Sequence, residues 1–367
     1  MTTGPKQRRI AVFMPTWIGD CCMATPTLRA LRQKFPNSHI AMIARPVIGE
    51  LLEDAWGNAP RWYDEVIQFQ KRGNSDNGEV VSRLQLPKRI RAGRFDLGIL
   101  LTNSFWTAAT MRLGGIKNIV GYNRDLRGWL LAEKLQPPRD RNGWLPIPAI
   151  DYFLRLASHI GCNTTDRHME LAVSDSDQRM AKDLWKQLAF DSDTPTLVFN
   201  SNSATQAERV WPKDKIMRVI RQVTQELNWQ VLIHCGPGER EQANEIAAGL
   251  ADPRVASMGI CEDLPIGLSK AVLQKASVVV STDSGPRHLA VALGSQVVTL
   301  FGPTDPAWTQ TYNRPEILLQ PNSTIESQTT STNGNTRDIS VVQVVEAIYD
   351  AKAHLEEHAK TRSSQAA

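Results

Sequence analysis

The residues most suited to chemistry in this sequence form a D-S-G-x-x-H string, in which Asp283, Ser284 and Gly285 precede His288. The string lies between an apolar strand-like run and a helical pattern, so Asp283 or Ser284 can cap the helix that follows. The free N–H groups of the first turn, led by Gly285, then form the positive end of a helix dipole, which suits a phosphate. The alternative is that the first two residues only cap the helix and that His288 is an ordinary surface histidine.

A second candidate group follows the first apolar run of the chain, in the loop that contains Gly19 and Asp20. Gly19 permits a tight turn, and Asp20 comes at the start of the next helical pattern. The carboxylate of Asp20 can cap that helix, or it can act as a general base that takes a proton from an acceptor hydroxyl. The spacing alone favours the capping role.

A third candidate group is the loop SNSATQAERVWP, residues 201–212. The loop follows a strand-like run and is rich in hydroxyls, and Arg209 stands just before Trp211 and Pro212. Hydroxyls, backbone N–H groups and one guanidinium can together cradle a diphosphate. The alternative is a polar linker with a solvated arginine.

Motifs for cofactors and metals are incomplete. Gly236-Pro237-Gly238 lacks the third glycine of a dinucleotide fingerprint, and no G-K-[ST] string is present for a P-loop. Two D-x-D strings, at 175–177 and 191–193, flank a predicted helix rather than the end of a strand, so we interpret them as solvated helix ends. We therefore expect neither a metal nor a cofactor.

The elements that must position these groups alternate between strands and helices. Apolar runs rich in strand formers, such as Ile10–Met14 and Ser277–Ser281, are followed by helical patterns. This alternation predicts an α/β fold with mostly parallel sheets covered on both faces. We expect one domain over residues 1–172 and a second over residues 173–367, with ligands in a cleft at the carboxyl ends of the sheets.

Individual elements are predicted in enough detail to be tested. Helices are expected over Cys21–Lys34, Val80–Ala92 and Gly285–Leu293, the last ended by Gly294 in a left-handed conformation. A final helix over Val341–His358 is expected to precede a disordered tail at 361–367. The Ser/Thr/Asn-rich stretch 322–336 is expected to be a surface loop.

Composition is that of a globular protein long enough for two domains: 367 residues, 41% hydrophobic and 22% charged. The net charge of +4 suits an anionic substrate or a membrane-surface acceptor, although many ordinary enzymes are equally basic. The five cysteines show no disulfide or zinc pattern, and no apolar run approaches the ~20 residues of a membrane helix. We expect a cytoplasmic protein whose contact with the inner membrane is peripheral.

The candidate groups occur together and in order, and on that basis the chain resembles the ADP-heptose:lipopolysaccharide heptosyltransferases of glycosyltransferase family 9, in particular the heptosyltransferase II-like members. The resemblance covers roughly residues 9–349. Its motifs are PTWIGD (15–20), ERVWP (208–212), TDSGPRHLAVALG (282–294) and LFGPTDP (300–306). The resemblance implies a GT-B fold, with two Rossmann-like domains whose mostly parallel sheets face a central cleft, and an inverting, metal-independent transfer.

The resemblance also implies roles for individual residues. Asp20 takes the place of the family's general base. Arg209 stands where relatives usually have a lysine that stabilises the leaving diphosphate, which keeps the charge but changes its geometry. Thr205 matches a hydroxyl that binds phosphate, and the string 283–288 binds the nucleotide diphosphate. Pro286-Arg287 replaces a commoner small or apolar pair.

Two further assignments leave alternatives open. An acidic residue after the G-x-G turn holds the donor ribose in relatives, and Glu239 and Glu241 both fit. Arg124 and Arg127 are candidates for binding acidic groups of an acceptor, or for a solvated helix start.

The expected reaction moves a heptose from ADP-heptose to a lipid-linked or oligosaccharide acceptor of the lipopolysaccharide core type, with no nucleic acid involved. One alternative is a sugar-nucleotide epimerase of the same fold, which would need further carboxylates and a histidine such as His234 around the donor sugar. The other is a non-catalytic nucleotide-sugar-binding protein.

Overall fold

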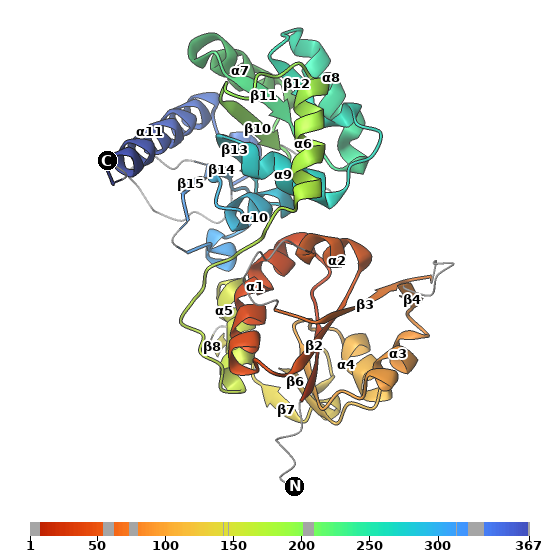
Figure 1. The fold of residues 1–367 in the computed structure, drawn as a ribbon. Helices are drawn as coiled ribbons and strands as arrows, with labels where there is room; N and C mark the ends of the chain where they lie inside the picture. Colours follow the sequence, from red (N-terminus) through yellow and green to blue (C-terminus); the bar gives the residue numbers. More distant parts are fainter. Residues whose placement is uncertain are drawn as a thin grey trace. The chain divides into compact units, whose positions relative to one another are not determined.

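The computed structural model of the chain describes residues 8–53, 62–72, 80–141, 143–145, 147–200, 209–312, 314–321 and 334–365. The chain divides into two compact units (Figure 1). Unit 1 comprises Met1–Glu170 and Ala307–Tyr312, and unit 2 comprises Leu171–Pro306 and Asn313–Ala367. Within unit 1 the Tyr312 hydroxyl donates to the Asp151 carboxylate, which ties the short segment to the rest of the unit.

Unit 1 is built on a seven-stranded sheet in which every pair of neighbouring strands is parallel. In spatial order the strands are β4 (Val80–Ser82), β3 (Glu65–Gln70), β2 (His39–Ala44), β1 (Arg9–Phe13), β5 (Leu97–Leu100), β6 (Asn118–Tyr122) and β7 (Glu133–Leu135). Strand β1 is central, because Ile10 lies opposite Ile40 on one side and Leu97 on the other. Its apolar run is buried, as expected for a strand covered on both faces.

Helices cover both faces of this sheet. They are α1 (Ile18–Lys34), α2 (Pro46–Leu52), α3 (Leu86–Gly93), α4 (Phe105–Leu113) and α5 (Ala149–His159), with the 3₁₀ turn η1 (Gly128–Leu130) and a small hairpin of β8 (Arg139–Asp140) and β9 (Gly143–Trp144). Helices α1 and α5 pack side by side (Figure 1). Helices α3 and α4 pack together over a core that includes Phe13, Leu100 and Met111.

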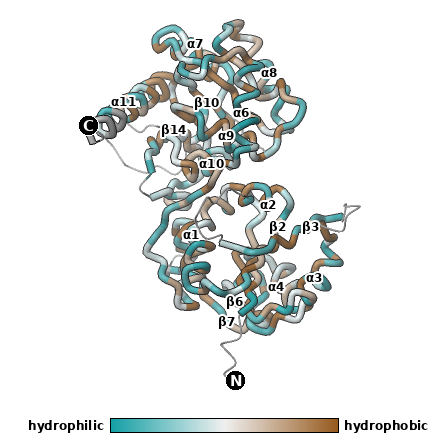
Figure 2. Tube along the Cα trace, viewed as in Figure 1, coloured by the Kyte–Doolittle hydropathy of each residue, from teal (hydrophilic) through white to brown (hydrophobic). Residues whose placement is uncertain are grey.

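Unit 2 repeats the scheme with a six-stranded parallel sheet. Its strands in spatial order are β12 (Val255–Ser257), β11 (Gln230–Ile233), β10 (Thr196–Asn200), β13 (Val278–Thr282), β14 (Gln296–Leu300) and β15 (Glu316–Leu319). Its helices are α6 (Asp175–Gln187), α7 (Lys213–Gln222) with the π turn η3 (Val223–Leu227), α8 (Arg240–Leu250), α9 (Ile266–Lys275), α10 (Gly285–Ala292) and α11 (Val341–Gln365). Short 3₁₀ turns are η4 (Pro237–Glu239), η5 (Met258–Ile260), η6 (Pro306–Thr309) and η7 (Thr336–Asp338). Figure 2 shows hydrophobic and hydrophilic residues alternating along α11, the pattern of a helix with one buried face.

The predicted fold class, α/β with two Rossmann-like units of mostly parallel sheet, is confirmed. Gly294 has the predicted left-handed conformation, with φ of 82°. At 175–177, Ser174 and Asp177 form a capping box at the start of α6, which agrees with the interpretation of that string as a helix end. No helix within the described ranges combines the length and apolar character of a membrane span.

Some predicted boundaries are wrong. The predicted helix over residues 80–92 is instead strand β4 followed by α3, which starts at Leu86 because Pro87 suits the first turn of a helix. The expected disordered tail is helical as far as Gln365. Helix α1 begins at Ile18, three residues before the predicted start. Most of the predicted surface loop, residues 322–333, lies outside the described residues.

Candidate functional site

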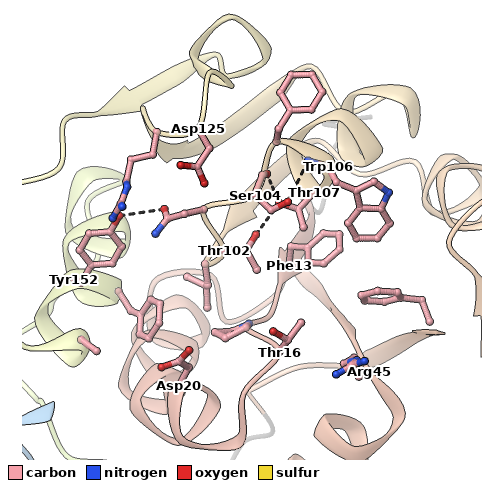
Figure 3. A pocket seen from close by; sticks show the side chains of 18 of the residues that line it. Phe13, Thr16, Asp20, Arg45, Thr102, Ser104, Trp106, Thr107, Asp125 and Tyr152 are labelled. Carbon is pink, nitrogen blue, oxygen red and sulfur yellow. Dashed lines mark hydrogen bonds between the residues drawn. The ribbon is translucent and has the colours of Figure 1, made fainter. Parts of the chain in front are cut away.

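Asp20 lies in the first turn of α1, directly after the loop that follows β1. The N-cap residue of α1 is Trp17, so the prediction that Asp20 caps this helix is wrong. The Cys21 thiol donates to the carbonyl of Pro15 at 3.2 Å and ties the helix start to the preceding loop. This geometry directs the Asp20 carboxylate towards a cavity in unit 1 (Figure 3).

Helix α1 holds Asp20 in place although it contains a proline. Pro26 has no N–H to donate to the carbonyl of Cys22, which would leave that buried carbonyl without its helical bond. The hydroxyl of Thr25 donates to the same carbonyl at 2.7 Å. Because the Thr25 hydroxyl replaces the N–H that Pro26 lacks, the helix continues to Lys34.

The cavity has a volume of about 620 Å³ and lies at the carboxyl ends of the parallel strands of unit 1. Aromatic rings, hydroxyls and guanidinium groups line it; examples are Phe13, Trp106, Tyr152, Thr16, Thr102, Ser104, Arg45, Arg83 and Arg124. Aromatic rings pack against the apolar faces of sugars, and guanidinium groups bind carboxylates and phosphates. The cavity therefore suits an anionic saccharide.

Burial raises the pKa of Asp20 from 3.8 to about 6. In the part of the chain that the structure describes, no hydrogen bond or ion pair to its carboxylate is found. A carboxylate that is charged at neutral pH, yet holds a proton more strongly than usual, has the properties of a general base.

Arg124 and Arg127 lie in different environments. Arg127 is fully buried: its Nε donates to the carbonyl of Tyr122 at 2.9 Å and its Nη2 to Oδ1 of Asn103 at 3.1 Å. These bonds direct its donors into the protein, so we correct the prediction that Arg127 binds an acceptor: it positions the loop after β5. Arg124 is half-buried and lines the cavity, so it remains a candidate.

In unit 2, helix α10 begins at Gly285, as the D-S-G string predicted. Ser284 is the N-cap residue, but its hydroxyl donates to the carbonyl of Thr282 at 3.2 Å and accepts from Nδ2 of Asn200 at 3.2 Å. The prediction that Ser284 caps the helix through its side chain is therefore wrong. A first turn without a side-chain cap can offer its N–H groups to an anion.

The Asp283 carboxylate is paired with Arg287. Nη1 of Arg287 lies 2.9 Å from Oδ1 of Asp283, while Nε and Nη2 donate to the two oxygens of Glu316 at 2.6 and 3.1 Å. All three side chains are buried. In the sequence, Arg287 stands out only as a departure from the family's usual residue pair, and Glu316 lies in strand β15, which the sequence pattern did not predict.

Arg209 lies beside this network. Its Nη1 donates to the carbonyl of Asp283 at 2.9 Å and is 3.8 Å from Oδ2 of the same residue. The buried Trp211 anchors the segment, since its ring stacks on Phe199 and its Nε1 donates to the carbonyl of Ile339 at 3.2 Å. The guanidinium is thus held at the start of α10. Thr205, the predicted phosphate ligand, lies outside the described residues.

Two buried histidines adjoin the same edge of the sheet. His288 is buried, so the alternative of a surface histidine is wrong. Burial, and then the charge of Arg287, lowers the pKa of His288 to about 4, and burial lowers the pKa of His234 to about 4. Within the described ranges, Nδ1 of His288 and Nε2 of His234 have no hydrogen-bond partner. Both rings are therefore neutral at pH 7, and each has one nitrogen without a protein partner there.

The predicted ribose-binding carboxylates follow β11. Oε2 of Glu239 accepts from the backbone N–H of Gly236 at 2.9 Å, so Glu239 stabilises the turn η4. Glu241 is exposed in the first turn of α8. The geometry keeps both as candidates. Among the residues that the structure describes, no group of three His, Cys, Asp or Glu side chains is arranged to hold a metal ion.

Comparison with known proteins shows which family the chain is similar to. A family model described as glycosyltransferase family 9 (heptosyltransferase) matches residues 83–336. Lipopolysaccharide heptosyltransferase 1 of Pseudomonas aeruginosa is 34% identical over 336 residues, which cover 85% of this chain and 83% of the relative. Lipopolysaccharide heptosyltransferase 2 of Escherichia coli is 24% identical over 313 residues, 82% of this chain and 84% of the relative.

The solved structure of the E. coli ADP-heptose lipopolysaccharide heptosyltransferase II has the same fold, with a TM-score of 0.74 and 21% identity over 95% of this chain and 99% of that one. These matches favour a transferase over the epimerase and the non-catalytic alternatives. The family model and the curated relatives each extend over most of the chain, as do the motifs that carried the resemblance. The chain is therefore a glycosyltransferase and belongs to glycosyltransferase family 9, the heptosyltransferase family.

Proposed function

We propose that the protein transfers a heptose from ADP-heptose to an acceptor of the lipopolysaccharide core type, in one inverting step that needs no metal ion. The curated relatives are named as lipopolysaccharide heptosyltransferases, and one solved relative is named for ADP-heptose. Because that acceptor is lipid-linked, we place the reaction at the cytoplasmic face of the inner membrane. The single observation that carries the mechanism is the Asp20 carboxylate in the wall of the cavity of unit 1.

The acceptor occupies the cavity of unit 1 in this proposal. Arg45, Arg83 and Arg124 supply positive charge for its acidic groups, and Trp106 and Tyr152 supply faces for its sugar rings. An acceptor hydroxyl next to Asp20 can transfer its proton to the carboxylate as it attacks.

The donor diphosphate lies at the start of α10. Arg209 and the N–H groups of the first turn, beginning at Gly285, stabilise the negative charge that develops on the leaving group. Asp283, Ser284 and His288 shape this site, and Thr205 adds a hydroxyl. Glu239 or Glu241 binds the ribose.

The proposed transfer forms one bond, breaks one bond and moves one proton. The acceptor oxygen forms a bond to the anomeric carbon while the bond from that carbon to the diphosphate oxygen breaks. The acceptor proton passes to Asp20, and ADP leaves with the electron pair of the broken bond. A single displacement inverts the anomeric configuration.

Asp20→Asn tests the assignment of the base. The amide cannot accept the proton, so transfer to a deacylated core acceptor should fall by about 10²–10⁴-fold. Calorimetry should find the affinity for ADP-heptose within about twofold of the wild type, because the donor site is in unit 2. Asp175→Asn is a matched control, since Asp175 is an exposed carboxylate in the first turn of α6.

Transfer by Asp20→Asn within about threefold of the wild-type rate would remove Asp20 from the mechanism. Product analysis by NMR tests the inverting step, and retention of the donor configuration would exclude a single displacement. An assay in excess chelator tests metal independence, and loss of activity there would exclude a metal-independent reaction.

A further inference from the structure

Large apolar side chains are exposed next to the cavity of unit 1. Phe105, at the start of α4, is 44% exposed, and Leu126 and Trp129 are 90% and 71% exposed. We call these three residues the apolar surface. The rings of Phe105 and Trp129 lie 6.0 Å apart, which joins its two parts. Exposed aromatic and leucine side chains that gather in one place mark an interaction surface.

The turn that carries Leu126 has a strained backbone. Asp125 and Leu126 have φ values of 53° and 58°, a left-handed conformation that residues other than glycine rarely adopt. The buried guanidinium of Arg127 secures the turn through its bonds to Tyr122 and Asn103. The fold thus holds an apolar side chain out into solvent in a strained conformation, which a purely structural turn would not require.

Positive charge is concentrated in the same segment. Residues 80–145 contain twelve Lys and Arg but four Asp and Glu, a net charge of +8, whereas the whole chain carries +4. Arg112 of α4 donates from Nη2 to the carbonyl of Leu130 at 2.8 Å, next to Trp129, and Arg91 and Lys117 are exposed around the far end of the same helix. Tryptophan and leucine combined with lysine and arginine are typical of surfaces that lie in a membrane interface.

We propose that the apolar surface docks unit 1 on a bilayer that contains anionic lipid, a proposal that rests on the proposed function. Leu126 and Trp129 enter the interface between headgroups and acyl chains, and the surrounding cations contact the headgroups. A second copy of the chain is the poorer occupant, because two surfaces with this positive charge would repel each other.

The apolar surface lies beside the cavity, so docking on a bilayer would bring the cavity close to the lipid. Phe105 belongs both to the apolar surface and to the lining of the cavity, and Asp125 lines the cavity one residue before Leu126 (Figure 3). A lipid-anchored acceptor can therefore reach the cavity with its sugars while its lipid stays in the bilayer.

Vesicle cosedimentation tests the proposal with the full chain. Vesicles of phosphatidylcholine alone are compared with vesicles that contain phosphatidylglycerol in addition. The wild type should bind the anionic vesicles more tightly, and the double variant Leu126→Gln/Trp129→Gln should bind them at least about tenfold more weakly, because it loses the apolar area that would be buried. Val342→Gln, at an exposed valine of α11, is the matched control and should bind as the wild type does.

The outcomes separate this proposal from the proposed function. Transfer to a soluble, deacylated acceptor should be unchanged in the double variant, since neither residue lines the cavity, and circular dichroism checks that the variant folds. Equal binding of the wild type and the double variant to anionic vesicles, or no binding by the wild type, would overturn docking. A wild-type dimer that the double variant dissociates would show that a second copy is the occupant. Absence of soluble transfer in the wild type would overturn the proposed function alone.

Discussion

Asp283 and Arg287 form a buried ion pair one helical turn apart, with 2.9 Å between Oδ1 and Nη1 and side chains that are 5% and 1% exposed. Glu316 neutralises Arg287 from the other side through both of its oxygens. Arg287 alone cannot neutralise two carboxylates, and Arg209, 3.8 Å from Oδ2 of Asp283, supplies the second positive charge. Asp283 therefore positions Arg209 at the start of α10, beside the proposed diphosphate site.

The first prediction concerns Arg287. Replacement by methionine keeps much of the volume but leaves the carboxylates of Asp283 and Glu316 buried without their cation. We expect a loss of about 3–5 kcal/mol in the free energy of unfolding of unit 2, measured by urea denaturation. Arg218→Met, at an exposed position of α7, should change stability by less than about 0.5 kcal/mol. Equal stability of the two variants would contradict the role of the buried network.

The pH dependence of the reaction follows from Asp20. Its pKa is raised to about 6 by burial, and a general base acts only in its deprotonated form. Below pH 6 the carboxylate gains a proton, so kcat/KM should fall about tenfold for each unit of pH, whereas above pH 6 it should be level. Steady-state rates with a soluble acceptor between pH 5 and 9 measure this profile. A rate that stays constant down to pH 5 would mean that Asp20 is not the base.

Arg209 provides a prediction about charge and geometry. Arg209→Ala removes the cation next to the start of α10, so kcat should fall by about 10²–10³-fold. Arg209→Lys restores the residue type that is common in relatives and should recover most of this loss. Rapid-quench measurement of ADP formation gives both values, and a lysine variant as slow as the alanine variant would show that the guanidinium acts through its bond to Asp283 rather than through its charge.

The two arginines after β6 should behave differently when each is changed to methionine. Arg127→Met removes buried donors from the carbonyls of Tyr122 and Thr102 and from Oδ1 of Asn103. Tyr122 and Asn103 each keep another donor, so we expect a total loss of about 1–3 kcal/mol in stability. Arg124→Met should leave the melting temperature nearly unchanged and should raise the KM for the acceptor. Thermal melts and acceptor titrations distinguish the two, and a reversed pattern would overturn the placement of Arg127.

The sequence predicted the parts of the site that depend on where strands end. Asp20 and Gly285 each follow an apolar run that could only be a buried parallel strand, so their location at a sheet edge could be inferred. The partners of those residues could not be inferred, because side-chain pairing depends on packing. Arg287 reaches Glu316 only because β15 lies next to β14, and the short run of β15 carries a charged residue that hides its strand character.

The errors have similar physical causes. Ser284 has the residue type of a helix cap, but Asn200 and Thr282 compete for its hydroxyl. Arg127 resembled a surface residue because its neighbours are polar, whereas the fold directs its side chain to the carbonyls of the loop after β5. Helix α11 continues through a polar tail that the sequence marked as disordered.

The bond between Arg287 and Glu316 spans 29 positions of the sequence and restricts how the family can diverge. Loss of Arg287 alone would leave the carboxylates of Glu316 and Asp283 buried without their shared cation, a form that selection should remove. Lineages with a small residue in place of Arg287 should therefore also have an uncharged residue in place of Glu316, so the two positions are inherited as a unit.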